Sequence, residues 1–256
     1  MAVEFIIVLF LFLVGASIGS FLNVLVIRFV TKENVVTSRS HCMQCGKILK
    51  WYELIPVFSF ILLRGRCASC GSAIAVQYPI VEFGAGLAFL AFGLPVEEFS
   101  WLSILSFSIF CVLAVLFMID LKTFLLPDFY IILLTLSVLA LYVLGYAKMS
   151  GTTSWAVIAG SGFLLALWAA TGGGGLGLGD VKLMIPLGLL FGLPGVAAVL
   201  FCSFILGGAT GIWLLVTKKA SPKTPIPFGP FLAGVAMLFL LWPALPNLLW
   251  QFILPL

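Results

Sequence analysis

Charged residues are scarce in this chain of 256 residues, at 9%, whereas 63% of its residues are hydrophobic. A soluble globular protein carries about a quarter charged residues, so this composition excludes a soluble globule. The chain also has one histidine and only nine acidic residues, so each candidate for acid–base chemistry can be considered individually. What the sequence has in abundance is long apolar runs, and these predict a polytopic membrane protein.

Seven apolar stretches are to be compared with the ~20 residues that cross the hydrocarbon core of a bilayer. They are Val3–Ile27, Ile74–Pro95, Trp101–Ile119, Leu125–Tyr146, Trp155–Ala170, Leu183–Thr217 and Phe231–Leu254. The sixth stretch is too long for one crossing and contains Gly-Leu-Pro-Gly at 192–195, so we expect it to divide into a short helix and a full one. The predicted fold class is therefore all-α, with about eight transmembrane helices.

Basic residues indicate the orientation, because short cytoplasmic loops collect lysine and arginine. If the first helix runs from outside to inside, all of the thirteen basic residues except Lys148 fall in inner loops. They are Arg28, Lys32, Arg39, Lys47, Lys50, Arg64, Arg66, Lys122, Lys182, Lys218, Lys219 and Lys223. The outer loops carry Glu4, Glu97 and Glu98. We therefore expect both termini to face outward, and the net charge of +4 reflects topology and not a nucleic-acid partner.

The extended polar segment between the first two stretches contains two Cys-x2-Cys pairs. Cys42 and Cys45 form the first pair, and Cys67 and Cys70 form the second. Four thiolates at this spacing suit a tetrahedral zinc ion, and disulfides, the alternative, are disfavoured in a reducing cytoplasmic loop. We predict a structural zinc that supplies much of the folding energy of the loop. Because four cysteines complete the metal shell, His41 is expected at the surface.

These features predict three parts of the chain. A first transmembrane helix occupies residues 1–27, a zinc-binding cytoplasmic loop domain occupies 28–73, and a membrane domain of seven helices occupies 74–256. The two remaining cysteines, Cys111 and Cys202, lie in apolar stretches and are expected to be small core residues.

Two of the three aspartates lie where apolar stretches end. Asp120 ends the third stretch and Asp180 is expected to end the fifth, so the topology places both at the cytoplasmic boundary, each two positions before a lysine (Lys122 and Lys182). An ionisable group at membrane depth costs about 3 kcal/mol and is a functional candidate. If the two helices are neighbours, the carboxyl groups share one proton and hold a water, as in aspartic proteases. Asp128 is expected to be an N-cap or first-turn acid.

Six glycines occupy most of the segment Thr171–Asp180, directly before the second of these aspartates. Glycine tolerates non-helical backbone and leaves room for an unwound substrate strand, and irregular backbone at membrane depth is allowed where it lines a cavity. On these residues alone, a protease and a proton-coupled transporter with Asp120 and Asp180 as relay groups are equally consistent. A transporter site usually lies nearer the bilayer midplane. A zinc-clip scaffold that docks a cytoplasmic partner is a third alternative.

The sequence resembles the bacterial type IV prepilin peptidase family over nearly its whole length. The segments that carry the resemblance are Gly15–Arg28, the block from Cys42 to Cys70 with Leu-Arg-Gly-Arg-Cys, Gln77–Glu82, Ile119–Asp128, Gly177–Met184 and Pro227–Gly234. The resemblance implies that Asp120 and Asp180 are the catalytic pair, that the four cysteines bind zinc, and that the substrates are prepilins or pseudopilins. Family members lie in the bacterial inner membrane and cut on its cytoplasmic side, without a metal for the cut.

The resemblance also implies a second activity in the loop domain. Most members methylate the new N-terminus with S-adenosylmethionine, and Gly65 and Arg66 match positions linked to that transfer. Many family members have Asn-Ile-Pro where this chain has Glu-Leu-Ile-Pro at 53–56. A similar Glu-Leu-Ile-Pro string occurs in competence-type enzymes of Gram-positive bacteria, so the resemblance favours that branch. No soluble methyl-donor fold is visible in the sequence, so the donor site is not located. Glu82 is expected to orient Arg64 or Arg66.

Overall fold

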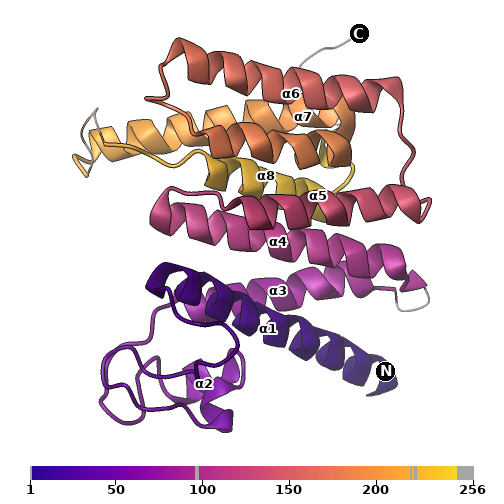
Figure 1. Ribbon diagram of the computed structural model, residues 1–256. Coiled ribbons are helices and arrows are strands. Elements are labelled where there is room, and N and C mark those ends of the chain that lie inside the picture. Colours follow the sequence, from indigo (N-terminus) through magenta and orange to yellow (C-terminus); the bar gives the residue numbers. More distant parts are fainter. Residues whose placement is uncertain (1, 96–97, 220, 222–223, 247–256) are drawn as a thin grey trace. The chain divides into compact units, whose positions relative to one another are not determined.

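The computed structural model describes residues 2–95, 98–219, 221 and 224–246. In this range the regular secondary structure is helical, with two isolated β-bridges. The elements in chain order are α1 (Ala2–Thr31), the 3-10 helix η1 (Trp51–Leu54), α2 (Phe58–Leu62), α3 (Gln77–Gly93), α4 (Trp101–Thr123), α5 (Asp128–Val143), α6 (Gly151–Ala170), α7 (Leu178–Val216) and α8 (Gly229–Leu241) (Figure 1). They form two compact units, unit 1 (Met1–Phe107) and unit 2 (Ser108–Leu256).

Each apolar stretch of the sequence corresponds to a helix, which confirms the all-α prediction for the described residues. Four of the described helices are long and apolar enough to cross a membrane: Glu4–Thr31, Trp101–Thr123, Gly151–Ala170 and Leu178–Val216. Because α5 and α8 are apolar but shorter, the count of eight transmembrane helices stays a prediction, as does the three-part division at residues 27 and 73. Glu97, Lys223 and the end of the last stretch from residue 247 lie outside the described residues.

In unit 1, α1 and α3 cross at very short range (Figure 1). A Cβ atom placed on Gly19 would lie 2.8 Å from the Cβ of Ala85 and 2.9 Å from the Cα of Glu82. One placed on Gly15 would lie 2.7 Å from the Ala85 carbonyl oxygen. All three distances are shorter than van der Waals contact. Small residues four positions apart allow helix backbones to approach in membranes, and this explains the two glycines of the segment 15–19.

A buried amide side chain joins the same two helices by hydrogen bonds. Asn23 has no exposed surface. Its Nδ2 donates to the carbonyl oxygen of Tyr78 at 3.3 Å, and its Oδ1 accepts from Nε2 of Gln77 at 3.1 Å. Because an unsatisfied buried amide costs about 1–3 kcal/mol, these bonds fix the position of α1 against the first turn of α3.

In unit 2, α7 is broken at the glycine where the sequence predicted a division. An unbroken helix of 39 residues would be about 58 Å long, well beyond the ~30 Å of a hydrocarbon core. Gly192 leaves the helical conformation with φ 65° and ψ −175°, and Pro194 cannot donate to the preceding turn. The hydroxyl of Tyr142 donates to the carbonyl of Leu189 at 2.6 Å, so α5 binds the turn of α7 that directly precedes the break.

The contact between α1 and α3 predicts a strong dependence on residue size at Gly19. We expect Gly19→Val to lower the free energy of unfolding by about 1–3 kcal/mol, because the added atoms overpack the helix crossing. The matched control is Gly84→Val on α3, where an added Cβ meets nothing within 4 Å. Thermal unfolding of the purified protein in detergent measures both, and equal midpoints for the two variants would contradict the packing role.

Candidate active site and metal centre

Unit 2 buries two of the three aspartates beside each other. Asp120 lies in the last turn of α4 and Asp180 in the first turn of α7. Only 4% of Asp120 and 5% of Asp180 is exposed. The carboxyl group of Asp120 lies against Gly229, and Leu126 packs against both Gly229 and Gly179, the residue before Asp180, so the two aspartates lie in the same part of unit 2 although they are distant in the sequence. The fold thus brings together the pair of side chains that the sequence singled out.

Each of these carboxyl groups is held by the backbone amide of a glycine. The N–H of Gly177 donates to Oδ2 of Asp180 at 3.0 Å, and the N–H of Gly229 donates to Asp120. Within the described ranges, no lysine or arginine forms an ion pair with either aspartate. Hydrogen bonds from backbone amides to a carboxylate are strong, and here they replace both the water and the cation that a buried acid would otherwise require.

Gly229 comes so close to Asp120 that a side chain would not fit between them. A Cβ atom on Gly229 would overlap Oδ2 of Asp120, and it would lie 3.0 Å from Cδ1 of Leu126. A Cβ atom on Gly179 would lie 2.9 Å from the Cβ of the same leucine. Leu126 is therefore packed between the starts of α7 and α8. No local pattern in the sequence indicates the roles of Gly229 and Leu126, although the string Pro-Phe-Gly-Pro at 227–230 is a signal for the glycine.

The predicted position of Asp180 is corrected by the structure. This residue begins α7 and does not end the preceding helix, because α6 stops at Ala170. Gly172 adopts a left-handed φ of +59°, and the N–H of Gly173 donates back to the carbonyl of Trp168 at 2.9 Å. This arrangement terminates a helix. The correction places Asp180 at the N-terminus of a helix, where its carboxyl group accepts the N–H of Gly177.

The glycine-rich segment has several distinct structural tasks. Gly172 and Gly173 end α6, Gly177 binds Asp180, and Gly179 admits Leu126. A Cβ atom on Gly175 would meet nothing within 4 Å. Only part of the segment is therefore open, and that part directly precedes the residues that hold Asp180.

Lys182 does not accompany the aspartate pair as the sequence suggested. Its Nζ donates to both carboxylate oxygens of Asp128, at 2.8 and 3.0 Å, on the exposed surface of unit 2. Asp128 lies in the first turn of α5 with Pro127 as the N-cap, which confirms the prediction of a first-turn acid. The ion pair leaves Asp120 and Asp180 in an environment without a neighbouring cation among the described residues.

Unit 1 holds the second candidate centre, made of the four paired cysteines. The sulfur atoms of Cys42, Cys45, Cys67 and Cys70 all lie within 4.8 Å of one another. Zinc–sulfur bonds of ~2.3 Å in a tetrahedron require sulfur atoms roughly 3.8 Å apart, and those of Cys42 and Cys70 are 3.8 Å apart. All six cysteines, each in the described part of the chain, are free thiols. The four residues therefore fit a metal ion.

The two cysteine pairs adopt the same local backbone. The N–H of Cys42 donates to the carbonyl of Lys47, and the N–H of Cys67 donates to that of Ser72, at 2.9 and 2.8 Å. Each turn closes with a glycine at positive φ, Gly46 at 68° and Gly71 at 70°, which glycine adopts without strain. Because the two turns have the same backbone, both pairs of sulfur atoms converge on the same candidate metal position.

The turns also stabilise thiolates before any metal binds. The backbone amides of Cys45 and Gln44, followed by the hydroxyl of Ser72, lower the pKa of Cys42 to about 6. The hydroxyl and amide of Ser72 likewise lower the pKa of Cys70. Since the thiolate is the form that binds metal, the shifts at Cys42 and Cys70 favour metal binding. Although the amide of Lys47 lowers it, burial and the sulfur atoms of Cys42 and Cys70 raise the pKa of Cys45 to about 11, so metal binding releases the proton of that thiol.

Glu53 supports this centre from the inside of the loop. Its carboxylate accepts the N–H of Lys50 at 2.8 Å and the Nζ of Lys47 at 2.9 Å. The amide of Lys50 has the larger effect and the side chain of Lys47 the smaller one, and both lower the pKa of Glu53. Lys47 follows the first cysteine turn directly, so the ion pair joins that turn to η1.

The suggested partner of Glu82 was wrong. Its Oε2 accepts the backbone N–H of Val57 at 2.7 Å, and Arg64 and Arg66 are both exposed. An exposed arginine is already solvated, whereas the amide of Val57 would be left unpaired without this acid. Glu82 therefore positions backbone and not a guanidinium group.

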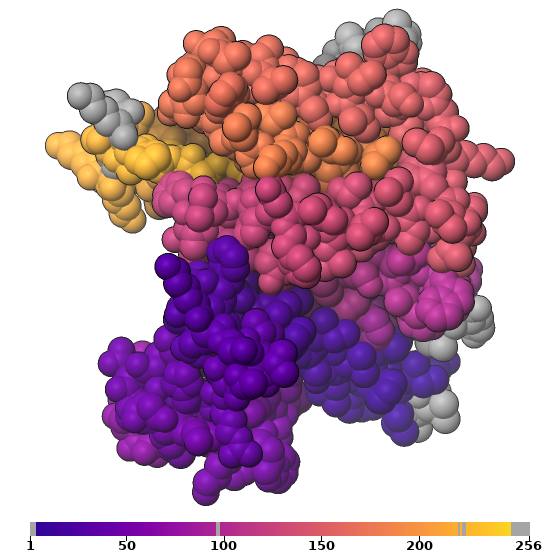
Figure 2. Space-filling view, in the orientation of Figure 1, coloured from indigo at the N-terminus to yellow at the C-terminus, as the bar shows by residue number. Residues whose placement is uncertain are grey.

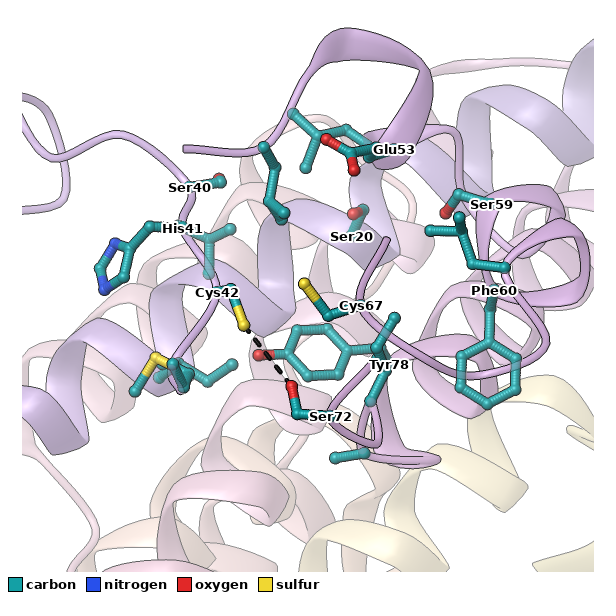
Figure 3. Close-up of a pocket in the computed structure, with 18 of the residues that line it drawn as sticks. Ser20, Ser40, His41, Cys42, Glu53, Ser59, Phe60, Cys67, Ser72 and Tyr78 are labelled. Carbon is teal, nitrogen blue, oxygen red and sulfur yellow. Dashed lines mark hydrogen bonds between the residues drawn. The ribbon is translucent and has the colours of Figure 1, made fainter. Parts of the chain in front are cut away.

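A cavity of about 310 Å³ lies beside the metal centre in unit 1. Cys42, Cys67 and Tyr78 point toward one another in it, whereas the ring of His41 points away from the two sulfur atoms (Figure 3). The polar or charged side chains among its lining residues include Ser20, Arg28, Glu33, Arg39, Glu53, Ser72 and Glu82. Gly65 and Arg66 do not line it. Gly65 instead turns the chain with φ 67° and packs against the ring of Phe60.

These observations define a class of protein: a helical membrane protein with a buried aspartate pair in one unit and a tetrathiol centre in the other. Residues 13–96 match the bacterial peptidase A24 N-terminal domain, and residues 107–212 match the type IV leader peptidase family. The chain belongs to the type IV leader peptidase family.

Several curated relatives cover most of the chain. It is 32% identical to the prepilin leader peptidase/N-methyltransferase of Bacillus subtilis, over 91% of this chain and 93% of the relative. It is also 32% identical to the protein of that name from Aeromonas hydrophila, over 90% and 89%. The corresponding protein of Myxococcus xanthus is 34% identical over 84% and 65%. These identities are similar, so the competence-type branch stays a prediction. The comparison with solved structures gave no match.

The sulfur geometry predicts one bound metal ion per chain. We expect Cys45→Ser to lose the metal, because three thiolates and a hydroxyl bind a soft divalent ion much more weakly. Elemental analysis of the purified protein after gel filtration measures the metal content. Cys111→Ser, at a buried cysteine of α4, is the control and should keep the metal. Equal metal contents in wild type and Cys45→Ser would exclude the tetrathiol centre.

Proposed function

We propose that this chain is an intramembrane aspartyl endopeptidase that removes the leader peptide of type IV prepilins or pseudopilins on the cytoplasmic side of the membrane. Asp120 and Asp180 are its catalytic pair. The observation that carries this proposal is the burial of two adjacent carboxyl groups that are bound by glycine amides and lack a cation. Family membership and the names of the relatives support a peptide substrate. The transporter alternative is not favoured.

The pair suits general acid–base hydrolysis. Two neighbouring buried carboxyl groups share one proton, because two adjacent negative charges repel each other in a medium of low polarity. The ionised partner takes a proton from a water that attacks the scissile carbonyl carbon, and the protonated partner donates its proton to the carbonyl oxygen. The tetrahedral intermediate then breaks as a proton moves to the leaving amine.

The open glycines before α7 are proposed to receive the substrate backbone. A peptide bond within a helix is not accessible to a water, so the substrate must be unwound around the cleavage site. An unwound segment exposes N–H and C=O groups that need partners at membrane depth. Gly175 presents backbone without a side chain in the way, and Gly177 links this backbone directly to Asp180.

The orientation follows from the charge distribution and is part of the proposal. The loops that carry lysine and arginine face the cytoplasm. The proposed topology places Asp120 and Asp180 on the same side of the membrane. The protein would then be a multi-pass protein of the bacterial inner membrane, with about eight crossings and both termini outward. Its partners would be prepilins and membrane lipid, and no nucleic acid.

We further propose that unit 1 carries the N-methyltransferase activity. Four thiolates at zinc distances support zinc as the structural metal. The adjacent cavity has the size of small-molecule sites, about 300–1,000 Å³, and it combines carboxylates with the phenol of Tyr78. A sulfonium cation is attracted by such groups, so this cavity is our candidate site for S-adenosylmethionine. Gly65 and Arg66 would act through the turn that leads into Cys67.

The catalytic pair is tested by removing one ionisable group at a time. We expect Asp120→Asn and Asp180→Asn each to lower the rate of prepilin cleavage by at least about 10⁴-fold, because neither variant can exchange the shared proton. Asp128→Asn is the matched control, since Asp128 is exposed and paired with Lys182, and it should keep most activity. Cleavage of a purified prepilin is followed by mass spectrometry. Prepilin cleavage by either variant would contradict the assignment of Asp120 and Asp180 as the catalytic pair.

The contact at Gly229 predicts that one methyl group disturbs the site. We expect Gly229→Ala to lower the cleavage rate by about 100-fold, because the Cβ atom must displace the Asp120 carboxyl group. Gly208→Ala on α7, where an added Cβ meets nothing within 4 Å, is the control. Both variants should unfold at similar temperatures. If Gly229→Ala cuts at the wild-type rate, Asp120 is not positioned by this contact.

The assignment of two activities to two units predicts that they can be separated. We expect Cys67→Ser to abolish methyl transfer while it lowers prepilin cleavage by less than about tenfold, because loss of the metal unfolds the loop and leaves unit 2 intact. Cys202→Ser, in α7, should retain both activities. Mass spectrometry of the processed pilin distinguishes the cut product from the cut and methylated one. A parallel loss of cleavage and methylation would argue against the separation.

A further inference from the structure

The loop of unit 1 has an exposed apolar surface that neither the metal centre nor the cavity uses. It consists of Trp51, Tyr52, Ile55, Phe58, Ile61 and Leu62, and we call it the outer face. Trp51 and Leu62 are each 77% exposed and Ile61 is 64% exposed. The loop forms a rounded lobe in the space-filling view (Figure 2). Apolar side chains that gather in this way on a polar segment mark an interaction surface.

The short helix α2 is two-sided, and only one side belongs to the cavity. Phe58, Ile61 and Leu62 have the spacing of one helix face, and all three are exposed. Ser59, Phe60 and Leu63 point to the other side, where they line the cavity. The apolar side chains of the outer face are therefore not core residues that a small rearrangement would bury. They need a partner outside unit 1.

The exposed charged side chains next to the outer face in the sequence are all positive. Lys50 precedes it, and Arg64 and Arg66 follow it, all three exposed. The one acid within residues 50–66 is Glu53, which is buried and bound to Lys47. The surface that faces outward thus combines aromatic and aliphatic side chains with three cations and no exposed acid. Its chemistry is complementary to an apolar layer with negative charges above it.

The backbone holds this segment beside α3. The N–H of Val57 is bound by Glu82, which lies in the second turn of that helix. Val57 itself has a φ of 62°, which is rare for a branched side chain, and the N–H of Phe58 donates to the carbonyl of Pro56 at 2.6 Å. This tight γ-turn, fixed by a buried acid, sets the direction in which α2 leaves η1.

The hydrogen bond between Glu82 and Val57 also indicates how deep the segment around Val57 lies relative to the membrane. Glu82 is five residues after Gln77, the first residue of α3, which is about 8 Å along the helix axis. The headgroup layer on each side of a bilayer is roughly 5–8 Å thick. If α3 crosses the membrane as the proposed topology requires, Val57 and the side chains that flank it lie at the level of the headgroups and not beyond them.

We propose that the outer face is an interfacial anchor, which inserts into the headgroup layer of the membrane that the chain itself crosses and binds anionic lipid. Tryptophan and tyrosine favour this layer because their rings are amphipathic, and Lys50, Arg64 and Arg66 attract anionic headgroups. The anchor holds the metal loop flat against the membrane surface. This inference rests on the crossing of the membrane and is independent of the peptidase chemistry.

The test locates Trp51 in lipid. The full chain is placed in nanodiscs of phosphatidylglycerol and phosphatidylcholine, with or without bromine on the acyl chains near the headgroups. Bromine quenches tryptophans that it contacts, and subtraction of the Trp51→Phe signal isolates Trp51 from the other tryptophans of the chain. We expect the Trp51 signal to be quenched by brominated lipid and protected from acrylamide in the water. Access to acrylamide without bromine quenching would overturn the anchor, and so would protection from both, because protein would then cover the face.

A second set of variants tests the anchor without relying on Trp51. We expect Ile61→Ser/Leu62→Ser to raise the rate of trypsin cleavage after Arg64 in the same nanodiscs by about tenfold or more, because the lost apolar groups weaken interfacial binding. Replacing phosphatidylglycerol by neutral lipid should raise the wild-type rate by about fivefold for each cation that contacts the surface. Val36→Ser, at a 90% exposed apolar residue elsewhere in the loop, is the control. Equal rates in all variants and lipids would refute the proposal.

Discussion

The arrangement of unit 2 depends on keeping two carboxyl groups buried side by side without a cation. Transfer of an isolated carboxylate out of water is very unfavourable unless hydrogen bonds compensate it. The compensation here comes from backbone amides at the starts of two helices, Gly177 before α7 and Gly229 at the beginning of α8. A lysine or arginine in their place would hold both carboxylates ionised. Amide donors leave the pair able to share a proton, which is the property that hydrolysis requires.

Glycine is required at positions 179 and 229 because neighbouring side chains come too close to leave room for a Cβ atom. Gly229 and Gly179 both contact Leu126, and a Cβ atom on either would collide with it. This leucine therefore connects the end of α4, which carries Asp120, with the beginning of α7, which carries Asp180. The segments Ile119–Asp128, Gly177–Met184 and Pro227–Gly234 form one site. Each is short and separated from the others by whole helices, so their conjunction is a property of the fold.

Unit 1 contains a polar loop that has no hydrophobic core of its own, so other interactions must order it. Two equal cysteine turns bring four sulfur atoms to metal distance, and two buried acids bind backbone amides around them. Glu53 binds the amide of Lys50, and Glu82 binds that of Val57. The loop is thereby held from the inside by cysteine turns that fit a metal ion and by buried hydrogen bonds, and its apolar side chains at η1 and α2 remain available at the surface.

Features that depend on composition and on short spacing could be predicted from the sequence. Apolar runs predicted the helices, two Cys-x2-Cys pairs predicted the tetrathiol centre, and rare acids in apolar surroundings identified Asp120 and Asp180. The break at Gly192 was also predicted, since length alone required it. The partners of individual side chains could be seen only in the folded chain. Lys182 binds Asp128 and not the aspartate pair, Glu82 binds Val57 and not an arginine, and Gly229 binds Asp120. Such contacts join residues from separate helices, and their choice depends on how those helices pack, which no local pattern in the chain encodes.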